Sequence, residues 1–195
     1  MSADRQTIAA YEAHARAYAE RTGGAPAAGL AEFAAALPEG ARVLDLGCGP
    51  GDTAKRLMAQ GFSVDAVDAT PAMVAEARAR GVAARLATFD EIAGDALYDG
   101  IWANYSLLHA PRSAMPGHLA RLHRALKPGG LFHIGLKLGE GETRDALGRR
   151  YSYYTEAGLD RRLAEAGFTP VARGFREGTG QDGTGFHGIW IQSRG

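Results

Sequence analysis

The chain has 195 residues, with 22 basic and 22 acidic side chains and a formal net charge of zero. This length favours one domain that is large enough to bury its own core. The balanced charge excludes a global attraction to nucleic acid or to an anionic membrane. Cys48 is the only cysteine, so no intrachain disulfide can form, which fits a reducing compartment. The sequence shows neither a signal-peptide pattern nor a run long enough to span a membrane, so we expect a cytoplasmic location.

The predicted elements begin with two helices and continue as an alternation of strands and helices. The two helices are expected at 7–21 and 28–37. The strands that follow are expected at 41–46, 63–67, 83–87, 98–104 and 130–137, and the helices between them at 52–60, 71–80 and 112–126. Thr70 is expected to cap a helix that starts at Pro71, and Pro128-Gly129-Gly130 to stop the chain before the fifth strand. Such alternation predicts a parallel sheet covered by helices on both faces.

The last third of the chain has a different pattern. A helix is expected at 155–166, and two strands follow it at 168–176 and 185–193. The polar, glycine-rich loop between these strands is too short for a crossover helix, so the strands should pair antiparallel. The sequence therefore predicts an α/β, doubly wound, mostly parallel seven-stranded sheet with helices on both faces and an antiparallel C-terminal strand pair.

Residues 43–51 read Val-Leu-Asp-Leu-Gly-Cys-Gly-Pro-Gly and join an expected strand to an expected helix. Strand, glycine turn and helix together are typical of a nucleotide-cofactor site. Glycine permits positive φ and lets a ligand approach where a Cβ would clash, and the helix start offers free N–H groups. The carboxylate of Asp45 would repel a nearby pyrophosphate, so it favours a ligand with a positive charge.

The chain resembles class I S-adenosylmethionine-dependent methyltransferases, closely over 41–137 and in outline over its whole length. The glycine turn carries the resemblance together with Asp68, which lies 21 residues after Gly47. The stretch 99–109 and the turn 126–130 match two further family motifs in order. The most similar members are small bacterial enzymes of the tellurite-resistance and quinone-biosynthesis type. The resemblance implies a Rossmann-like fold, S-adenosyl-L-methionine as cofactor and S-adenosyl-L-homocysteine as product.

The resemblance also implies which residues hold the cofactor. In the family the glycine turn holds the methionine part and the sulfonium, and an acidic residue at the place of Asp68 binds the ribose hydroxyls, which suits a carboxylate with two acceptor oxygens. An N-terminal helix with tyrosines covers the cofactor in similar enzymes, although ordinary helix packing also explains such tyrosines here. The predicted cofactor-binding residues are Tyr11, Tyr18, Asp45, Gly47, Cys48, Gly49, Pro50, Gly51, Asp68, Ala69, Met73, Thr88, Phe89, Asp90, Asn104, Tyr105 and Ser106.

His109 is the candidate catalytic base, because it follows the fourth strand at the edge where open α/β sheets carry their active sites. Its ordinary pKa suits a proton acceptor near neutrality, whereas the alternative is a loop histidine that orders the backbone. The predicted substrate-side residues are His109, Lys137, Arg149 and Tyr151. The segment 138–151 is either a lid or a solvated, glycine-hinged loop, and the other histidines share no spacing that would predict a metal site.

We expect one methyltransferase domain over 1–195. Its parts are an N-terminal helical cap at 1–38, a cofactor-binding core at 41–137 and a substrate-side loop, helix and last strands at 138–195. The small size favours a small-molecule acceptor over a polynucleotide, and methyl transfer by in-line displacement needs alignment more than a protein nucleophile. The sequence selects neither the acceptor nor the oligomeric state.

Two other functions remain open at this point. Gly49 and Gly51 also fit a dinucleotide fingerprint, in which Asp68 would bind the ribose of NAD and the protein would be an oxidoreductase. Asp45 and the C-terminal strand pair argue against that reading. A non-catalytic module that only binds S-adenosylmethionine is the second alternative.

Overall fold

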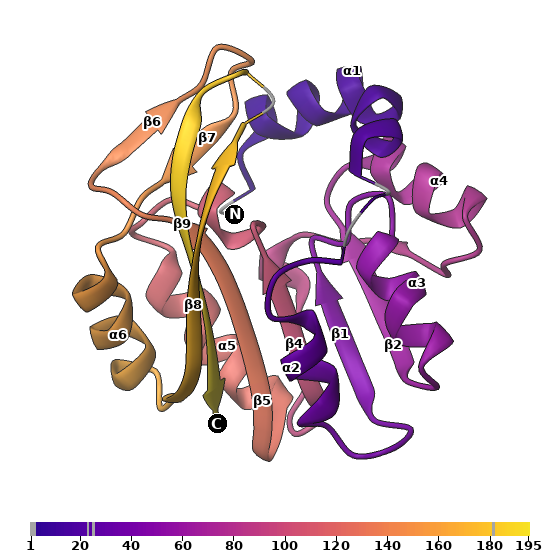
Figure 1. Cartoon of the computed structure of the whole chain (residues 1–195), viewed down its shortest axis with the longest axis vertical. Coiled ribbons are helices and arrows are strands. Elements are labelled where there is room, and N and C mark those ends of the chain that lie inside the picture. The colour runs from indigo at the N-terminus through magenta and orange to yellow at the C-terminus, as the bar shows by residue number, and fades with distance from the viewer. Residues whose placement is uncertain (1–2, 23, 25, 181) are drawn as a thin grey trace.

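A seven-stranded sheet runs through the middle of the molecule, and its strand order is β3-β2-β1-β4-β5-β9-β8 (Figure 1). The structure, a computed structural model, describes residues 3–22, 24, 26–180 and 182–195. The strands of this sheet are β1 (Arg42–Leu46), β2 (Ser63–Asp68), β3 (Arg85–Leu86), β4 (Tyr98–Asn104), β5 (Leu126–Lys137), β8 (Thr169–Thr179) and β9 (Gly185–Arg194). The first five pair in parallel, and β9 pairs antiparallel with both β5 and β8. The predicted fold class is confirmed.

Helices cover both faces of the sheet, and one further helix lies across the carboxyl ends of its parallel strands. The helices are α1 (Arg5–Thr22), α2 (Leu30–Ala35), α3 (Asp52–Ala59), α4 (Pro71–Ala79), α5 (Met115–Ala125) and α6 (Glu156–Glu165), with 3-10 turns η1 (Phe89–Glu91) and η2 (Leu107–His109). In Figure 1 the parallel strands point upward, and α1 crosses above their carboxyl ends. In the described residues no helix is long and apolar enough to cross a membrane.

The core has two main layers because successive strand residues face opposite sides of the sheet. In β4, Ile101 and Ala103 pack into the cluster that also contains side chains of α5 and α6. Trp102, between them, packs on the other side with Phe33 of α2 and Leu57 of α3. Burial on both faces is what an apolar parallel strand requires, and it fixes the carboxyl ends of β1, β2 and β4 beside one another.

Two local predictions differ from the structure. Helix α4 begins at Pro71 as expected, but the side chain of Thr70 makes no capping hydrogen bond. The backbone N–H of Thr70 donates to the Asp68 carboxylate at 2.8 Å. Residues 128–130 do not precede β5 but form an irregularity within it, where Tyr98 pairs with Leu126 and Gly100 with Leu131. Gly129, at φ 72°, makes the turn that this insertion requires.

A small antiparallel hairpin replaces the predicted loop at 138–151. It consists of β6 (Glu142–Arg144) and β7 (Arg150–Ser152) and forms a separate two-stranded sheet. The Asp145 carboxylate closes its turn by accepting hydrogen bonds from the backbone N–H groups of Leu147 (3.1 Å) and Arg149 (2.9 Å). In Figure 1 the hairpin lies near the N-terminal end of α1, at the same edge of the sheet as the carboxyl ends of the parallel strands.

Candidate functional site

The glycine turn after β1 has the backbone shape that its residues predict. Gly47, Gly49 and Gly51 have φ values of 76°, 52° and 85°, in the left-handed region that other residues rarely adopt. A Cβ on Gly47 would lie only 2.4 Å from the Cβ of Ser106. The backbone N–H groups of Gly47 and Cys48 donate to the Val67 carbonyl at 2.8 and 2.9 Å, which anchors the turn to β2. Glycine at 47 therefore lets the turn and the loop after β4 approach closely.

Asp68 ends β2 beside this turn. One carboxylate oxygen accepts a hydrogen bond from the Gly49 N–H at 2.9 Å, and the other accepts one from the Thr70 N–H at 2.8 Å. Burial raises the pKa of Asp68, and the backbone hydrogen bonds oppose that shift by stabilising the ionised form. A carboxylate has about four acceptor positions, so both oxygens can still receive hydrogen bonds from a ligand.

A first cavity of about 800 Å³, open mouth included, lies under α1 along the carboxyl ends of β1, β2 and β4. The predicted cofactor-binding residues that line it are Tyr11, Tyr18, Gly47, Gly49, Asp68, Ala69, Met73, Thr88, Phe89, Asn104, Tyr105 and Ser106. His109 also lines it, and so do residues that the motifs do not single out: Ala3, Asp4, Thr7, Ile8, Thr70 and Ala87. The sequence thus places most of this wall, and the start of the chain, before and within α1, supplies most of the rest.

Asp45, Cys48, Pro50, Gly51 and Asp90 belong to the predicted set but do not line this cavity. Asp45 is 2% exposed and lies beneath the turn, where its Oδ2 has no hydrogen-bond partner among the described residues. Burial, with Asp68 nearby, raises its pKa to about 7. Cys48 packs in a small apolar cluster, and burial raises the pKa of its thiol. Contact of these five residues with the cofactor stays a prediction.

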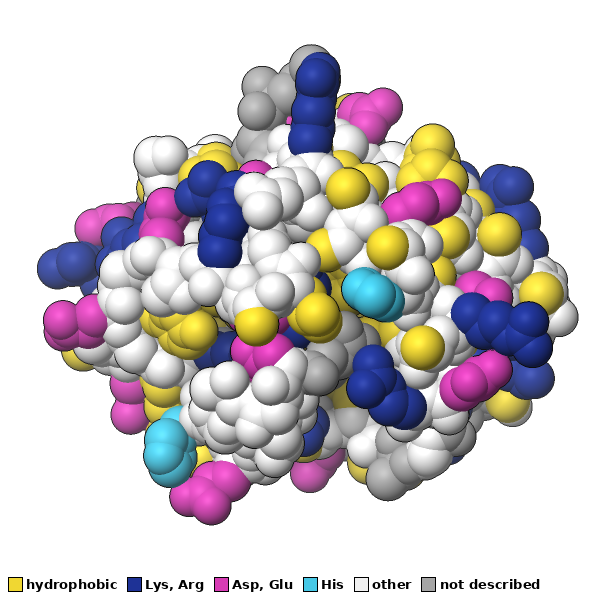
Figure 2. Space-filling view, turned by 90° about the horizontal axis from the view of Figure 1, so that it is seen from above, with side chains coloured by type: hydrophobic (Ala, Val, Ile, Leu, Met, Phe, Trp, Pro, Cys, Tyr) yellow, Lys and Arg dark blue, Asp and Glu magenta, His cyan; other side chains and the backbone are white. Residues whose placement is uncertain are grey.

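A second cavity opens beside the first, between α1 and the C-terminal strands. Its lining is Tyr11, Tyr18, Arg21, Tyr105, Leu108, His109, Lys137, Arg149, Tyr151, Arg176, Thr179, Gly180 and Phe186. All four predicted substrate-side residues are among them. Both cavities are lined by Tyr11, Tyr18, Tyr105 and His109, so these residues stand at the boundary. Figure 2 looks onto this edge of the molecule, where Lys and Arg side chains lie near the centre as well as around the rim.

Tyr105 shapes the boundary through an unusual backbone. Its φ is 54°, a value that costs energy for a bulky residue and is found mostly at functional sites. Its N–H donates to the Gly135 carbonyl at 2.9 Å, which holds the turn after β4. A Cβ on Gly188 would lie 2.2 Å from the Tyr105 hydroxyl, so glycine at 188 leaves room for the ring over β9.

His109 is held on both ring nitrogens. Its Nδ1 lies 2.6 Å from the Arg150 carbonyl, which can only accept, so Nδ1 carries the proton. Its Nε2 then accepts the hydrogen bond of the Tyr11 hydroxyl at 2.9 Å. Burial lowers the pKa of His109 to about 4, so the ring is neutral at pH 7. The basic nitrogen therefore faces Tyr11 and has no lone pair free for an acceptor.

The comparisons with known proteins agree with this geometry. The family described as "Methyltransferase domain" matches residues 18–173. The chain belongs to this methyltransferase family. Among curated relatives, a trans-aconitate 2-methyltransferase of Methylobacterium nodulans is 38% identical over 125 residues, 62% of this chain and 47% of that protein. A malonyl-[acyl-carrier protein] O-methyltransferase of Enterobacter lignolyticus is 34% identical over 47% of this chain and 37% of its own length. The chain thus spans less than half the length of these relatives.

Among solved structures, the methyltransferase domain is similar to the Burkholderia thailandensis 1,6-didemethyltoxoflavin-N1-methyltransferase, whose structure holds 1,6-didemethyltoxoflavin and S-adenosylhomocysteine. The two share 27% identity and a TM-score of 0.72, over 100% of this chain and 91% of the other. An S-adenosylmethionine-dependent methyltransferase of Methanosarcina mazei has a TM-score of 0.75 at 17% identity, over 87% of this chain and 97% of that one, and supports the fold.

The residues of this methyltransferase domain fit S-adenosylmethionine, its family's cofactor. Gly47 and Gly49 bring the backbone of the turn to the wall of the first cavity, and Asp68 presents acceptor oxygens to the same cavity. Three residues that belong to no motif, Arg21, Arg176 and Phe186, line the second cavity from α1, β8 and β9. Their only signal in the sequence is their place near element ends, since the register that brings β8 and β9 to the site is set by long-range pairing.

Proposed function

We propose that this chain transfers the methyl group of S-adenosylmethionine to a small-molecule acceptor held in the second cavity. The observation that carries the proposal is the common wall of the two cavities, formed by Tyr11, Tyr18, Tyr105 and His109. A cofactor in one cavity and an acceptor in the other would face each other across this boundary. The relatives are named for different acceptors, so their names do not choose one.

The protein's part in such a reaction is alignment. The sulfonium supplies an activated methyl group when the cofactor is bound. The walls must hold the acceptor about 3 Å from the methyl carbon, with water excluded. A lone pair of the acceptor forms the new bond, and the electron pair of the broken carbon–sulfur bond stays on sulfur as a neutral thioether. Because Nε2 of His109 accepts from Tyr11, the geometry favours His109 as a residue that positions Tyr11, and an acceptor whose reacting atom needs no strong base.

Asp68→Asn tests the cofactor half of this proposal. The substitution keeps the shape of the side chain but removes the charge that would strengthen hydrogen bonds from ribose hydroxyls. We expect S-adenosylhomocysteine to bind more weakly by about 1.5–3 kcal/mol, measured by titration calorimetry. Asp95→Asn is the matched control, because the Asp95 side chain is 79% exposed and pairs with an exposed arginine. Unchanged affinity in Asp68→Asn would remove the ribose assignment.

The catalytic half is tested with labelled cofactor. The full chain is incubated with S-adenosylmethionine that carries a tritiated methyl group and with pooled small molecules, and label in the products is counted. Transfer of label to a small molecule is the expected result. Tight cofactor binding without transfer to any pool would favour a non-catalytic binding module, and binding of NAD in place of the methionine-derived ligands would favour an oxidoreductase.

A further inference from the structure

The second cavity is basic. Its charged lining residues are Arg21, Lys137, Arg149 and Arg176, and no Asp or Glu is among the described residues that line it. The positive charge of Arg149 is balanced by an ion pair, because its guanidinium contacts the Asp145 carboxylate and both side chains are nearly buried. The net positive charge of the walls therefore comes from the other three side chains, and Lys137 is the buried one.

Lys137 is the last residue of β5, and the pairing with β9 sets it opposite Gly188. The residue is only 9% exposed. Its ammonium lies 3.9 Å from the centroid of the Tyr151 ring and 4.7 Å from that of Phe186. In the part of the chain that the structure describes, the ammonium has neither a hydrogen bond nor an ion pair. The ring faces attract the cation but do not replace the oxygen acceptors that it loses on burial.

The Lys137 side chain lines the second cavity, where its ammonium meets no oxygen acceptor of the described residues, and partial burial lowers the pKa of this group. Asp182 and Asp145 act in the opposite direction on this pKa, while Arg149 adds to the lowering. A protein gains from such an arrangement when a ligand supplies the missing oxygen. The two rings and the Tyr105 ring beside them leave a site with apolar walls and one charged contact, which suits a small organic monoanion or one end of a dianion.

We propose that the acceptor is a small organic carboxylate, and that its carboxylate pairs with the Lys137 ammonium between the rings of Tyr151 and Phe186. This inference rests on the proposed function, since it names the class of molecule that the second cavity takes. The carboxylate is an anchor, and the atom that receives the methyl group lies elsewhere on the same molecule. Pairing Lys137 with the reacting atom itself would weaken that atom as a nucleophile.

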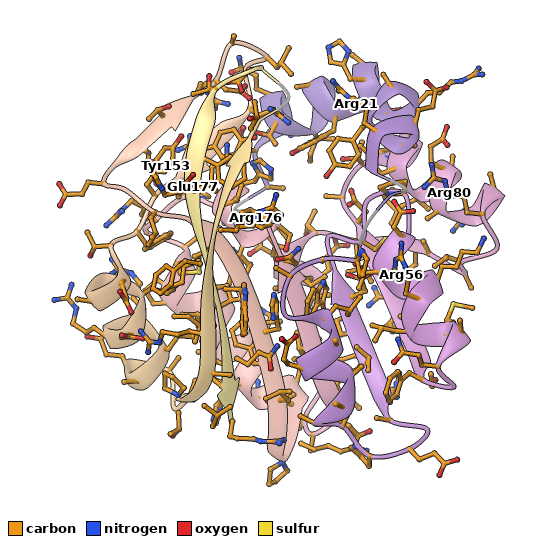
Figure 3. All side chains as sticks on the ribbon, in the orientation of Figure 1. Arg21, Arg56, Arg80, Tyr153, Arg176 and Glu177 are labelled. Atoms are coloured by element: carbon orange, nitrogen blue, oxygen red, sulfur yellow. The ribbon has the colours of Figure 1, made fainter. Side chains whose placement is uncertain are left out.

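Arg176 is a second cation at the same opening. Its guanidinium carbon lies 5.6 Å from the Tyr105 ring centroid and 5.7 Å from that of Phe186. Figure 3 shows Arg176 on the C-terminal strand pair and Arg21 on α1, on opposite sides of the opening. Arg176 is exposed, so it adds to the attraction that draws an anion inward, and it contributes less to the final affinity than a buried charge does.

The test uses the full chain saturated with S-adenosylhomocysteine. Four carboxylates and their uncharged amides serve as probes at millimolar concentration: benzoate and benzamide, salicylate and salicylamide, malonate and malonamide, succinate and succinamide. Phenyl phosphate is added as a different anion. The readout is the change in thermal midpoint beyond that of S-adenosylhomocysteine alone, with calorimetry for any probe that shifts it.

We expect at least one carboxylate to raise the midpoint and its amide to leave it unchanged. Lys137→Met should weaken that binding about tenfold or more, and Lys137→Arg should retain most of it. Lys55→Met removes the same charge from an exposed position on α3 and should bind the carboxylate as the unchanged protein does. S-adenosylhomocysteine affinity should be the same in all three variants, which also shows that each variant is folded.

Equal binding of an amide and its carboxylate would overturn the proposal, and so would full carboxylate affinity in Lys137→Met. Absence of any carboxylate effect across the panel, or binding of phenyl phosphate alone, would overturn it as well. A failure of the proposed function is distinguishable from these outcomes, because it shows in other readouts. Either S-adenosylhomocysteine itself would leave the midpoint unchanged, or the chain would bind it and transfer no label from the tritiated cofactor.

Discussion

At the scale of single residues, Asp45 shows how position changes the chemistry of a motif residue. It is the acidic member of the glycine motif, but the fold places it beneath the turn and 2% exposed. Burial disfavours the ionised form, and the nearby Asp68 carboxylate adds to this, so its pKa rises to about 7. A group with a raised pKa keeps its proton in the folded state over a pH range in which the unfolded chain has lost it.

This shift predicts a pH dependence of stability. The stabilising contribution of the Asp45 proton is fully present below pH 3.8 and is lost as the pH rises through about 7. Without ligand, the free energy of unfolding should therefore fall across this range, and Asp45→Asn should remove about 2–4 kcal/mol of that fall. Urea unfolding at several pH values measures it.

Asp95→Asn, at an exposed carboxyl, serves as the control and should leave the pH profile of stability unchanged. Parallel profiles for Asp45→Asn and the unsubstituted chain would show that Asp45 has an ordinary pKa in the folded protein.

The sequence motifs predict the site residues whose place in the fold follows from local sequence. Gly47, Gly49 and Asp68 lie at the ends of strands that alternation alone predicts, and the structure brings them to one cavity. Arg176 could not be predicted in this way, because nothing near this residue in the sequence indicates which partner strand it meets. The position of Lys137 at the end of the fifth strand predicts a place on the substrate side, but its contact with Tyr151 and Phe186 depends on the fold of three separate segments.

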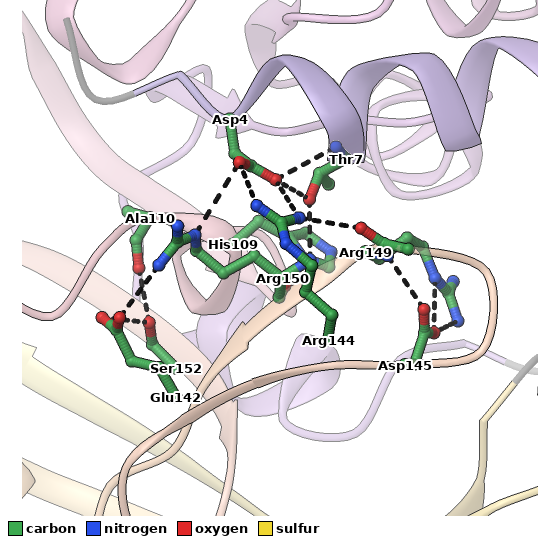
Figure 4. A network of polar contacts seen from close by, with 11 residues as sticks. Asp4, Thr7, His109, Ala110, Glu142, Arg144, Asp145, Arg149, Arg150 and Ser152 are labelled. Atoms are coloured by element: carbon green, nitrogen blue, oxygen red, sulfur yellow. Dashed lines mark hydrogen bonds and ion pairs between the residues drawn. The ribbon is translucent and has the colours of Figure 1, made fainter.

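At the scale of elements, the predicted helices and strands were found within a few residues, whereas the hairpin β6–β7 was not predicted. Each of its strands has three residues, which is too short to show a period of two. Figure 4 shows what the hairpin does: its arginines reach the N-terminal end of α1. Arg144 donates to both oxygens of Asp4, at 2.8 and 2.7 Å, and the Arg150 N–H donates to the Thr7 hydroxyl at 2.8 Å.

From these hydrogen bonds between the hairpin and the start of α1, we infer that the hairpin holds α1 over the first cavity. Asp4 also accepts a hydrogen bond from the Thr7 N–H at 3.0 Å, as a helix cap does. Asp4→Asn keeps a capping side chain but removes the charge that pairs with Arg144. We expect S-adenosylhomocysteine to dissociate about 2–5 times faster, the equivalent of about 0.5–1 kcal/mol for a partly exposed ion pair. Stopped-flow displacement measures this rate.

Arg16→Gln is the matched control for the helix. It breaks a pair with Glu20 on the outer face of α1, where the two side chains are 88% and 66% exposed. Its dissociation rate should equal that of the unsubstituted chain. Equal rates for Asp4→Asn and Arg16→Gln would show that the ion pair with Arg144 does not hold the helix over the cavity.

At the scale of the whole molecule, the first cavity unites segments that lie far apart in the chain. Its wall comes from α1, the turn after β1, the end of β2, the segment around η1 and the loop after β4. The second cavity adds the end of β5, the hairpin and the last two strands. Because the boundary residues Tyr11 and Tyr18 come from α1, the N-terminal helix is part of both sites. Occupation of one cavity should thus stiffen elements that also build the other.

Hydrogen exchange measures directly whether these segments become more rigid together when a ligand binds. On addition of S-adenosylhomocysteine, we expect slower exchange in α1 together with the glycine turn, the end of β2 and the loop after β4, since these elements would close on one ligand. Slower exchange should extend to the hairpin, which is tied to α1 through Asp4 and Thr7. Helix α6 contributes no lining residue to either cavity and is the internal control. NAD at the same concentration should change none of these segments, and protection confined to the glycine turn would show that α1 does not close on the ligand.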